Sequence, residues 1–310
     1  MRIAILKDEK SKDGSIDEMD NQDEADFAGK CLSGKHTVVQ IPFVSDLGKV
    51  MSDIRGFNPD VVFNLVESVC GSGAMSIIAV QMLEVMGIPF TGNHIFSHMI
   101  SADKSLAKRV LMENGIPVPD SSFRPGCEYM LKARNEHASI ALDDNCISKF
   151  ASEKALDEAL AAKKSETGLA WIAERYIDGR EFNCAFLGDV DLPPTEIRYD
   201  DKFVGHKIIT YEAKWHEQSD AYRMSLRSFD VEEKVRRALL GLMDLCRRKL
   251  DLKGYARVEF RMDGNGGFYV IDINTNPCIS PDSGFTAMAL RHGISNEEMF
   301  QMIVDDAFNS

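Results

Sequence analysis

The chain has 310 residues, of which 44% are hydrophobic, so it can bury a substantial core and is long enough for two or three domains. Its formal net charge of -13 and lack of a long basic run argue against a nucleic-acid partner, because phosphate backbones are bound by clustered Lys and Arg. No apolar run reaches the length of a membrane span, and seven scattered cysteines suggest neither a zinc site nor disulfides, so we expect a cytoplasmic protein that binds no membrane.

Strands and helices alternate along the first hundred residues. Strands are expected at 3–6, 37–42 and 61–66, and helices at 23–32, 45–55 and 74–86. This alternation predicts a parallel sheet covered by helices. The acidic segment 7–23 is expected to form a loop. Gly71 and Gly73 follow the third strand and open a helix, which fits either a phosphate-binding loop or, more commonly, a tight turn.

The rest of the chain divides into two further parts. A short strand at 87–92 and a helix at 102–114 are followed by strands at 129–133, 146–150 and 171–176 and by a helix that Ser152 caps. The last third opens with a strand at 181–187 and contains a long helix with a capping box at 230–233, a hairpin and two terminal helices. We expect three domains, at 1–99, 100–178 and 179–310.

The hairpin near the C-terminus is the most informative pattern. Two strands are joined by the glycine-rich turn 263–267. Alternation along each strand places Arg257 and Glu259 on one face, and Asp272 and Asn274 on one face of the neighbouring strand. Oxygen ligands of this kind suit Mg²⁺ shared with phosphates, whereas Zn²⁺ would require His or Cys. The pattern predicts a nucleoside triphosphate site, and the alternative is a solvated hairpin.

From Val61 onward the chain resembles the ATP-grasp superfamily, and within it the D-alanine-D-alanine ligases. The resemblance is carried by the order and spacing of short segments: VVFNLV (61–66), GIPFTG (87–92), DK (103–104), LK (131–132), ERYIDGREF (174–182), YEAKW (211–215), RVE (257–259) and DINTNP (272–277). It implies the ATP-grasp fold, an α/β and α+β architecture. In that fold an N-terminal parallel βα domain precedes a small central domain and a C-terminal domain, and these last two clamp ATP.

The resemblance also implies which residues bind ATP and the metal. The ATP-binding residues would be Lys104, Lys132, Ser139, Glu174, Tyr176, Ile177 and Glu181. The lysines would hold phosphates, the hinge after Glu174 would read adenine through its backbone, and Glu181 would accept the ribose hydroxyls. The metal ligands would be Glu259, Asp272 and Asn274, which would hold two Mg²⁺ ions, with Mn²⁺ as an alternative.

The implied chemistry is the joining of a carboxylate to an amine. The carboxylate attacks the terminal phosphate of ATP to give an acylphosphate, and an amine then displaces phosphate. Lys214 would reach the terminal phosphate, and Arg257 would face the developing negative charge. Such catalysis is positioning and charge neutralisation, and it needs no nucleophilic side chain.

The substrate segments depart from the ligase pattern. The early Gly-Gly-x-Ser-x-Glu segment is absent from 7–18, Glu67 and Ser68 replace a His-Gly pair, and the glycine-rich lid is replaced by 135–140. Ser283 falls where the ligases hold the second substrate's carboxylate, but Asp282 beside it would repel a carboxylate and could hold an amine. Glu67, Asp282 and Ser283 are therefore the candidate substrate residues.

We expect a ligase that joins amino acids or peptides other than two D-alanines. The alternatives are an authentic D-alanine-D-alanine ligase, a nucleotide-binding regulator without turnover, and a small-molecule kinase that stops at phosphoryl transfer. The retained catalytic set opposes the regulator, and ADP release without an amine would identify the kinase. The resemblance also allows a homodimer formed through the N-terminal domain.

Overall fold

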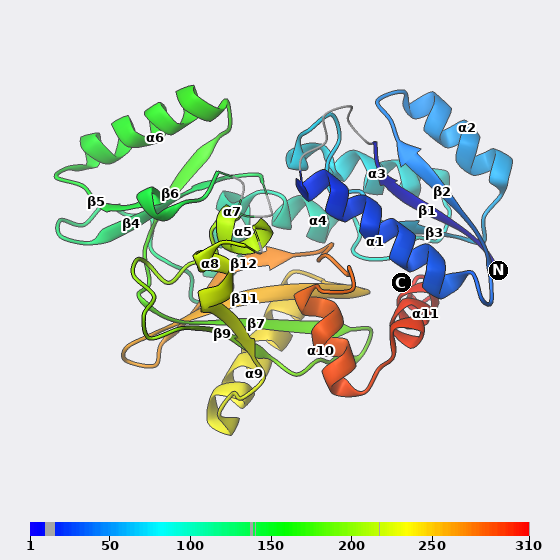
Figure 1. Ribbon diagram of the computed structural model, residues 1–310. Coiled ribbons are helices and arrows are strands. Elements are labelled where there is room, and N and C mark those ends of the chain that lie inside the picture. The colour runs from blue at the N-terminus through cyan, green and yellow to red at the C-terminus, as the bar shows by residue number, and fades with distance from the viewer. Residues whose placement is uncertain (10–15, 137–138, 140, 217, 310) are drawn as a thin grey trace.

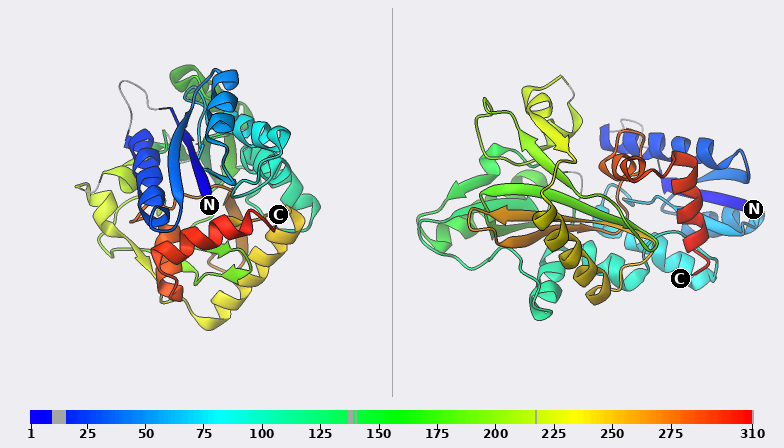
Figure 2. Two further views of the ribbon diagram at one scale, coloured as in Figure 1. Left: turned by 90° about the vertical axis from the view of Figure 1, so that its right-hand side faces the viewer. Right: turned by 90° about the horizontal axis from the view of Figure 1, so that it is seen from below.

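The computed structural model describes residues 1–9, 16–136, 139, 141–216 and 218–309, and these form three sheets (Figure 1). The described part of the chain contains no helix with the length and apolarity that crossing a membrane requires. The two termini lie at the same end of the molecule (Figure 2).

The N-terminal sheet is parallel, as the alternation predicts. Its strands are β1 (Arg2–Asp8), β2 (Thr37–Phe43) and β3 (Val61–Asn64), in the order β2-β1-β3. Its helices are α1 (Ile16–Leu32), α2 (Leu47–Phe57) and α3 (Ile77–Met86), with the short 3-10 helix η1 (Gly73–Met75) before α3. Both faces of β1 are covered, because Ile3 and Ile5 pack with α1 while Ala4 and Leu6 pack with α2 and α3. This double burial explains the unbroken apolar run of the strand.

The central sheet is small and antiparallel. It consists of β4 (Glu128–Ala133), β5 (Ile147–Lys149) and β6 (Trp171–Arg175), in the order β5-β4-β6, with a 3-10 turn η2 (Asp144–Cys146) before β5. Helix α6 (Glu153–Thr167) packs on it, and Ser152 is its N-cap, because the side chain accepts a hydrogen bond from the Ala155 N–H.

The third sheet carries most of the candidate residues. Its strands are β7 (Gly179–Leu187), β8 (Val190–Asp191), β9 (Thr195–Tyr199), β10 (Ser225–Ser228), β11 (Tyr255–Asp263) and β12 (Phe268–Asn274). Helix α9 (Glu233–Lys249) lies along one face of this sheet (Figure 2). Phe182, Val258 and Phe260 pack with Leu239 and Met243 of α9, so alternation directs Glu181, Arg257 and Glu259 to the opposite face.

The remaining helices connect these layers. They are α4 (Ile95–Ser101), α5 (Lys104–Glu113), α7 (Tyr211–Trp215), α8 (Asp220–Met224), α10 (Gly284–His292) and α11 (Asn296–Asp306). Although α11 ends the chain, its Phe300 packs on Phe63 of the N-terminal sheet, with ring centroids 5.8 Å apart. The C-terminal helix therefore completes the core of the N-terminal layer.

Two predicted elements are wrong. The segment 87–92 is no strand, since only Phe90 bridges to Val62. Gly92 turns away with a φ of +92°, and a Cβ on Gly254 would lie 3.0 Å from its Cα, so this glycine permits close backbone packing. The loop predicted over 7–23 is also incorrect at its C-terminal end, because α1 begins at Ile16, whereas 10–15 lie outside the described residues.

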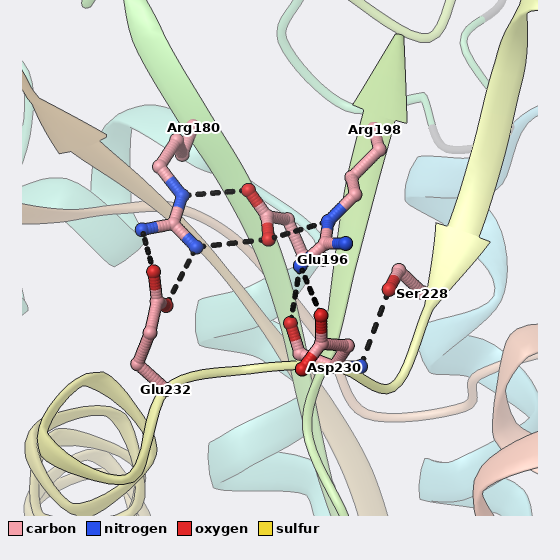
Figure 3. Close-up of polar contacts among 6 residues, drawn as sticks. All are labelled: Arg180, Glu196, Arg198, Ser228, Asp230 and Glu232. Carbon is pink, nitrogen blue, oxygen red and sulfur yellow. Dashed lines mark hydrogen bonds and ion pairs between the residues drawn. The ribbon is translucent and has the colours of Figure 1, made fainter.

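The predicted capping box of α9 is also wrong. Glu232 is the N-cap and makes no side-chain capping bond. The acids before α9 instead bind arginines of the neighbouring sheet, Glu232 at 2.8 Å from Arg180 and Asp230 at 3.3 Å from Arg198 (Figure 3). Both arginines also contact Glu196, which lies between them. These acidic residues therefore form ion pairs with the sheet and do not cap the helix.

Candidate functional site

A cavity of about 670 Å³ is lined by residues of both antiparallel sheets, of α7 and of loops beside the N-terminal sheet. The structure brings every predicted site residue to this cavity: Glu67, Lys104, Lys132, Ser139, Glu174, Tyr176, Ile177, Glu181, Lys214, Arg257, Glu259, Asp272, Asn274, Asp282 and Ser283. Glu67 and Ser283, which are 216 positions apart in the chain, thus line the same cavity. Their individual roles stay predictions.

The hairpin brings the four predicted side chains together, in a register that one irregularity shifts. Arg257 lies opposite Asn274, and Glu259 lies opposite Asp272, with an irregularity after Glu259. The Arg257 guanidinium contacts Glu259 Oε1 from Nη2 at 2.8 Å and from Nε at 3.1 Å. Asn274 Oδ1 accepts the Asn276 N–H at 3.0 Å. The hairpin therefore presents carboxylate and amide oxygens beside one guanidinium.

These oxygens fit a magnesium site better than a zinc site. Among the described residues, no three or more His, Cys, Asp or Glu side chains are grouped to enclose a metal. The candidate set contains two carboxylates and one amide, Glu259, Asp272 and Asn274. Such a partial oxygen set suits Mg²⁺, which retains waters and takes further ligands from substrate phosphates.

Lys104 and Lys132 line the cavity wall formed by α5 and β4, and a third lysine, Lys108, lies behind them. Lys132 Nζ lies 2.7 Å from Glu174 Oε1 and donates to the Ile271 carbonyl at 2.9 Å. Lys108, one turn after Lys104 on α5, pairs with the other oxygen of Glu174. Glu174 is only 2% exposed and Lys132 9%, and this burial lowers the pKa of Lys132 to about 8. The sequence interpretation missed Lys108, although its spacing of four from Lys104 places both on one helix face.

A buried arginine lies at the other end of the cavity. Arg261 is 3% exposed and contacts Glu181 Oε2 at 2.7 Å. It also donates to the Ile177 carbonyl at 3.2 Å and to the Lys207 carbonyl. Arg261 therefore joins the predicted ribose carboxylate to the hinge and to the loop before α7. Alternation with Arg257 and Glu259 was the signal that could have found it.

The same end contains an unsatisfied polar atom. The Tyr199 hydroxyl is buried and has no hydrogen-bond partner among the described residues. Burial raises the pKa of Tyr199, and the nearby Glu181 carboxylate adds to the effect. A buried hydroxyl without a partner is costly, but Tyr199 is not among the residues that line the cavity.

The segment that replaces the glycine-rich lid contacts the N-terminal layer. Glu136 Oε2 accepts the Gly73 N–H at 3.2 Å, and Lys104 Nζ donates to the Glu136 carbonyl. A Cβ on Gly73 would lie 2.9 Å from Glu136 Oε2 and 3.0 Å from the Asn135 carbonyl oxygen, so a larger residue would displace the Glu136 side chain and crowd the main chain. Gly71, at φ +74°, belongs to a tight turn. Ser139 donates to the Ile209 carbonyl at 2.9 Å, while residues 137, 138 and 140 lie outside the described residues.

Carboxylates gather where β1, α1 and the segment after β3 meet. Asp8 accepts hydrogen bonds from the N–H groups of Glu67 and Ser68. Glu24 accepts the Ile279 N–H at 2.6 Å, and Asp20 lies 3.2 Å from the Cys278 sulfur. Burial, reinforced by the Asp8 charge, raises the pKa of Glu67 to about 8, while Lys214 and Arg257 oppose the shift. This acidic wall faces the cavity through Asp20 and Glu67.

Ser283 and Asp282 have local structural partners. The Ser283 hydroxyl accepts the Thr286 N–H and donates to Thr286 Oγ1, both at 3.1 Å, and so caps α10. Asp282 Oδ1 accepts a hydrogen bond from Ser280 Oγ at 3.0 Å. The hydroxyl proton of Ser283, predicted to hold a carboxylate, is therefore already used.

Comparisons with known proteins agree with this architecture. The family model described as D-ala D-ala ligase C-terminus matches residues 130–305. The D-alanine-D-alanine ligase of Sphingopyxis alaskensis is 29% identical over 88% of this chain and 87% of its own length. That of Moorella thermoacetica is 29% identical, with 98% of each chain covered. A crystal structure of D-alanine-D-alanine ligase from Bacillus anthracis complexed with ATP has a TM-score of 0.75 at 18% identity, covering 100% of this chain and 98% of that one.

Proposed function

The chain belongs to the D-alanine-D-alanine ligase family and is an ATP-dependent enzyme that forms a C–N bond, and we propose that it joins amino acids or short peptides other than two D-alanines. The observation that carries this proposal is the substrate end of the cavity. There the Ser283 hydroxyl caps a helix, and Glu67 lies among Asp8, Asp20 and Glu24. A carboxylate-rich wall opposite Arg257 and Lys214 suits zwitterionic substrates.

The nucleotide end supports the predicted ATP contacts. Lys104 and Lys132 line the cavity and would hold phosphates, and Tyr176 and Ile177 also line it and would form the hinge beside the purine. Glu181 has one oxygen on Arg261, so its Oε1 is the oxygen that would accept a ribose hydroxyl. Glu259, Asp272 and Asn274 would hold Mg²⁺, two ions in our proposal, which supplies neutralisation of phosphate charge when bound.

The proposed reaction has two steps at the hairpin. The substrate carboxylate attacks the terminal phosphorus, a bond to oxygen forms, and ADP leaves. The amine then attacks the acyl carbon, a C–N bond forms, the C–O bond to phosphate breaks, and the ammonium proton is lost. Arg257, held by Glu259, would stabilise the oxyanion of the second step, and Lys214 would orient the transferred phosphate. We retain domain bounds of 1–99, 100–178 and 179–310 as part of this proposal.

The test is ADP release from Mg²⁺-ATP across D- and L-amino acids and short peptides, offered singly and in pairs, with product masses recorded. We expect release to need one carboxylate and to rise with one amine. Two D-alanines as the best pair would refute the substrate proposal, and release with a single acceptor and no amine would indicate a kinase.

Matched variants test the site itself. Glu259→Ala and Asp272→Ala remove proposed metal ligands and should abolish ADP release while the melting temperature stays close to that of the parent. Glu158→Ala, an exposed acid on α6, is the control and should release ADP normally. Unchanged release in both hairpin variants would exclude them from the metal site.

A further inference from the structure

Arg227 lies on β10, the edge strand of the largest sheet, and lines the cavity beside the start of α10. Among the residues that the structure describes, its Nη1 and Nη2 atoms approach only main-chain acceptors, the carbonyls of Asp282 and Ser283, and all three distances are 3.5 Å. Such distances are at the outer limit of hydrogen bonding. No described Asp or Glu forms an ion pair with Arg227, so its charge is poorly compensated in the protein.

A second guanidinium faces the same space. Arg257 contacts Glu259 through Nε and Nη2, which leaves Nη1 for other partners. Arg227 is exposed at the mouth of the cavity, and its partial desolvation there, together with the neighbouring charge of Arg257, lowers its pKa. Two like charges so close repel each other, and an anion that contacts both relieves the repulsion.

The other groups near this space do not supply that anion. The Asp282 charge partly offsets the field at Arg227, but its carboxylate accepts from Ser280 and forms no ion pair with the guanidinium. The Ser283 hydroxyl donates to Thr286, so it does not replace the guanidinium groups as a holder of carboxylate. The two arginines are therefore available as donors to an acidic ligand here.

We propose that Arg227 and Arg257 together hold the acidic end of the amine substrate, and that this substrate is an amino acid with two carboxylates, of the aspartate or glutamate type. The Arg227 guanidinium is a planar fork that matches one carboxylate, and Arg257 adds its Nη1 donor and its charge beside it. A monocarboxylic amino acid would leave Arg227 unpaired, whereas a dicarboxylic one pairs both arginines. The inference rests on the proposed function and specifies the substrate class of that same cavity.

Isosteric amines provide the test. In the ADP-release assay, kcat/KM is measured for glutamate against glutamine and for aspartate against asparagine, each as D and L forms, with a saturating carboxylate partner. We expect kcat/KM for one acid to exceed that for its amide by at least about tenfold, because the amide has no side-chain charge and leaves Arg227 unpaired. Arg227→Met should reduce that ratio to about one, and Arg227→Glu should shift the preference toward lysine.

Two control variants test whether the effect is specific to the Arg227 guanidinium. Arg237→Met removes an arginine that is mostly exposed on α9 and should leave the acid-to-amide ratio unchanged. Arg227→Lys keeps the charge without the fork and should retain an intermediate ratio. Circular dichroism melting of each variant shows whether it is folded, and if Arg227→Met is not, the lysine and glutamate variants carry the test.

The outcomes separate the two proposals. Equal kcat/KM for acid and amide, or a preference for the acid that survives Arg227→Met, overturns the inference and leaves the ligase assignment intact. ADP release with no carboxylate and amine pair refutes the proposed function and the inference with it.

Discussion

Lys108 offers the sharpest test of how the phosphate end is organised. It pairs with one oxygen of Glu174 while Lys132 lies 2.7 Å from the other, and Glu174 is 2% exposed. Lys108→Met would leave both Glu174 oxygens to Lys132 and so neutralise a lysine that is predicted to bind phosphate. We therefore expect weaker ATP binding, although Lys108 itself need not touch ATP.

The size of the effect follows from burial. Removing one member of a buried ion pair costs about 3–5 kcal/mol, and Glu174 keeps Lys132 as a partner, so we expect Lys108→Met to lower the free energy of unfolding by about 3 kcal/mol. Glu174→Gln should cost a similar amount, because it leaves two buried lysines facing each other. In the double variant Lys132 keeps its hydrogen bond to the Ile271 carbonyl. The double variant should therefore lose about 2 kcal/mol less free energy of unfolding than the sum of the losses in the two single variants.

Two measurements decide this prediction. Urea unfolding of the parent, both single variants and the double variant gives the coupling free energy. The KM for ATP gives the functional coupling, which should rise about tenfold in Lys108→Met and recover in the double variant, because Lys132 then has no carboxylate on it. Single effects that add within about 0.5 kcal/mol, together with no recovery of KM, would refute the shared-carboxylate argument.

Three further predictions follow from single buried groups. Burial raises the pKa of Glu67 to about 8, so its protonated form is favoured in the folded protein. The stability of the parent relative to Glu67→Gln should therefore be greatest below the ordinary pKa of 4.5 and should be lost as pH rises to about 8. Melting temperatures of the two proteins that run parallel from pH 5 to about 9 would contradict this prediction. Burial lowers the pKa of His98 to about 4, so the neutral form is favoured in the folded protein. The stability that this contributes is fully present above pH 6.5 and is lost as pH falls toward 4. When melting temperatures are recorded from pH 7 to about 4, this decline should be smaller in His98→Gln. Arg261→Met leaves Glu181 buried without its partner and should raise the KM for ATP about tenfold with a smaller fall in kcat; equal changes in both parameters would argue against a nucleotide-positioning role.

The sequence predicted well those features that local periodicity determines. The parallel N-terminal sheet follows from apolar runs separated by helical segments, and the faces of the two hairpin strands follow from alternation. In the turn of this hairpin Asp263 Oδ1 accepts the N–H groups of Asn265 and Gly267, which holds the two strands in place. Alternation assigned Arg257 and Glu259 to one face and Asp272 and Asn274 to one face of the neighbouring strand. It did not predict the irregularity after Glu259, which sets Glu259 opposite Asp272.

Features that depend on distant partners could not be predicted in this way. Segment 87–92 has the composition of a strand, but its glycine serves close packing against Gly254. Asp230 and Glu232 have the composition of a helix start, but Arg198 and Arg180 bind them from the sheet. In both cases a tertiary contact outweighs the local preference.

The same limit applies to the charges of the cavity, where it bears directly on function. Sequence position placed Lys132, Glu181 and Ser283 in the site, but each already has a protein partner: Glu174, Arg261 and Thr286 respectively. No sequence motif contains Arg227, yet within the described part of the chain its guanidinium meets only two carbonyls, both at 3.5 Å. Because a ligand competes with existing partners for each donor, a weakly compensated cation contributes more to its recognition than one already paired. Substrate choice should therefore respond more strongly to Arg227 than to Ser283.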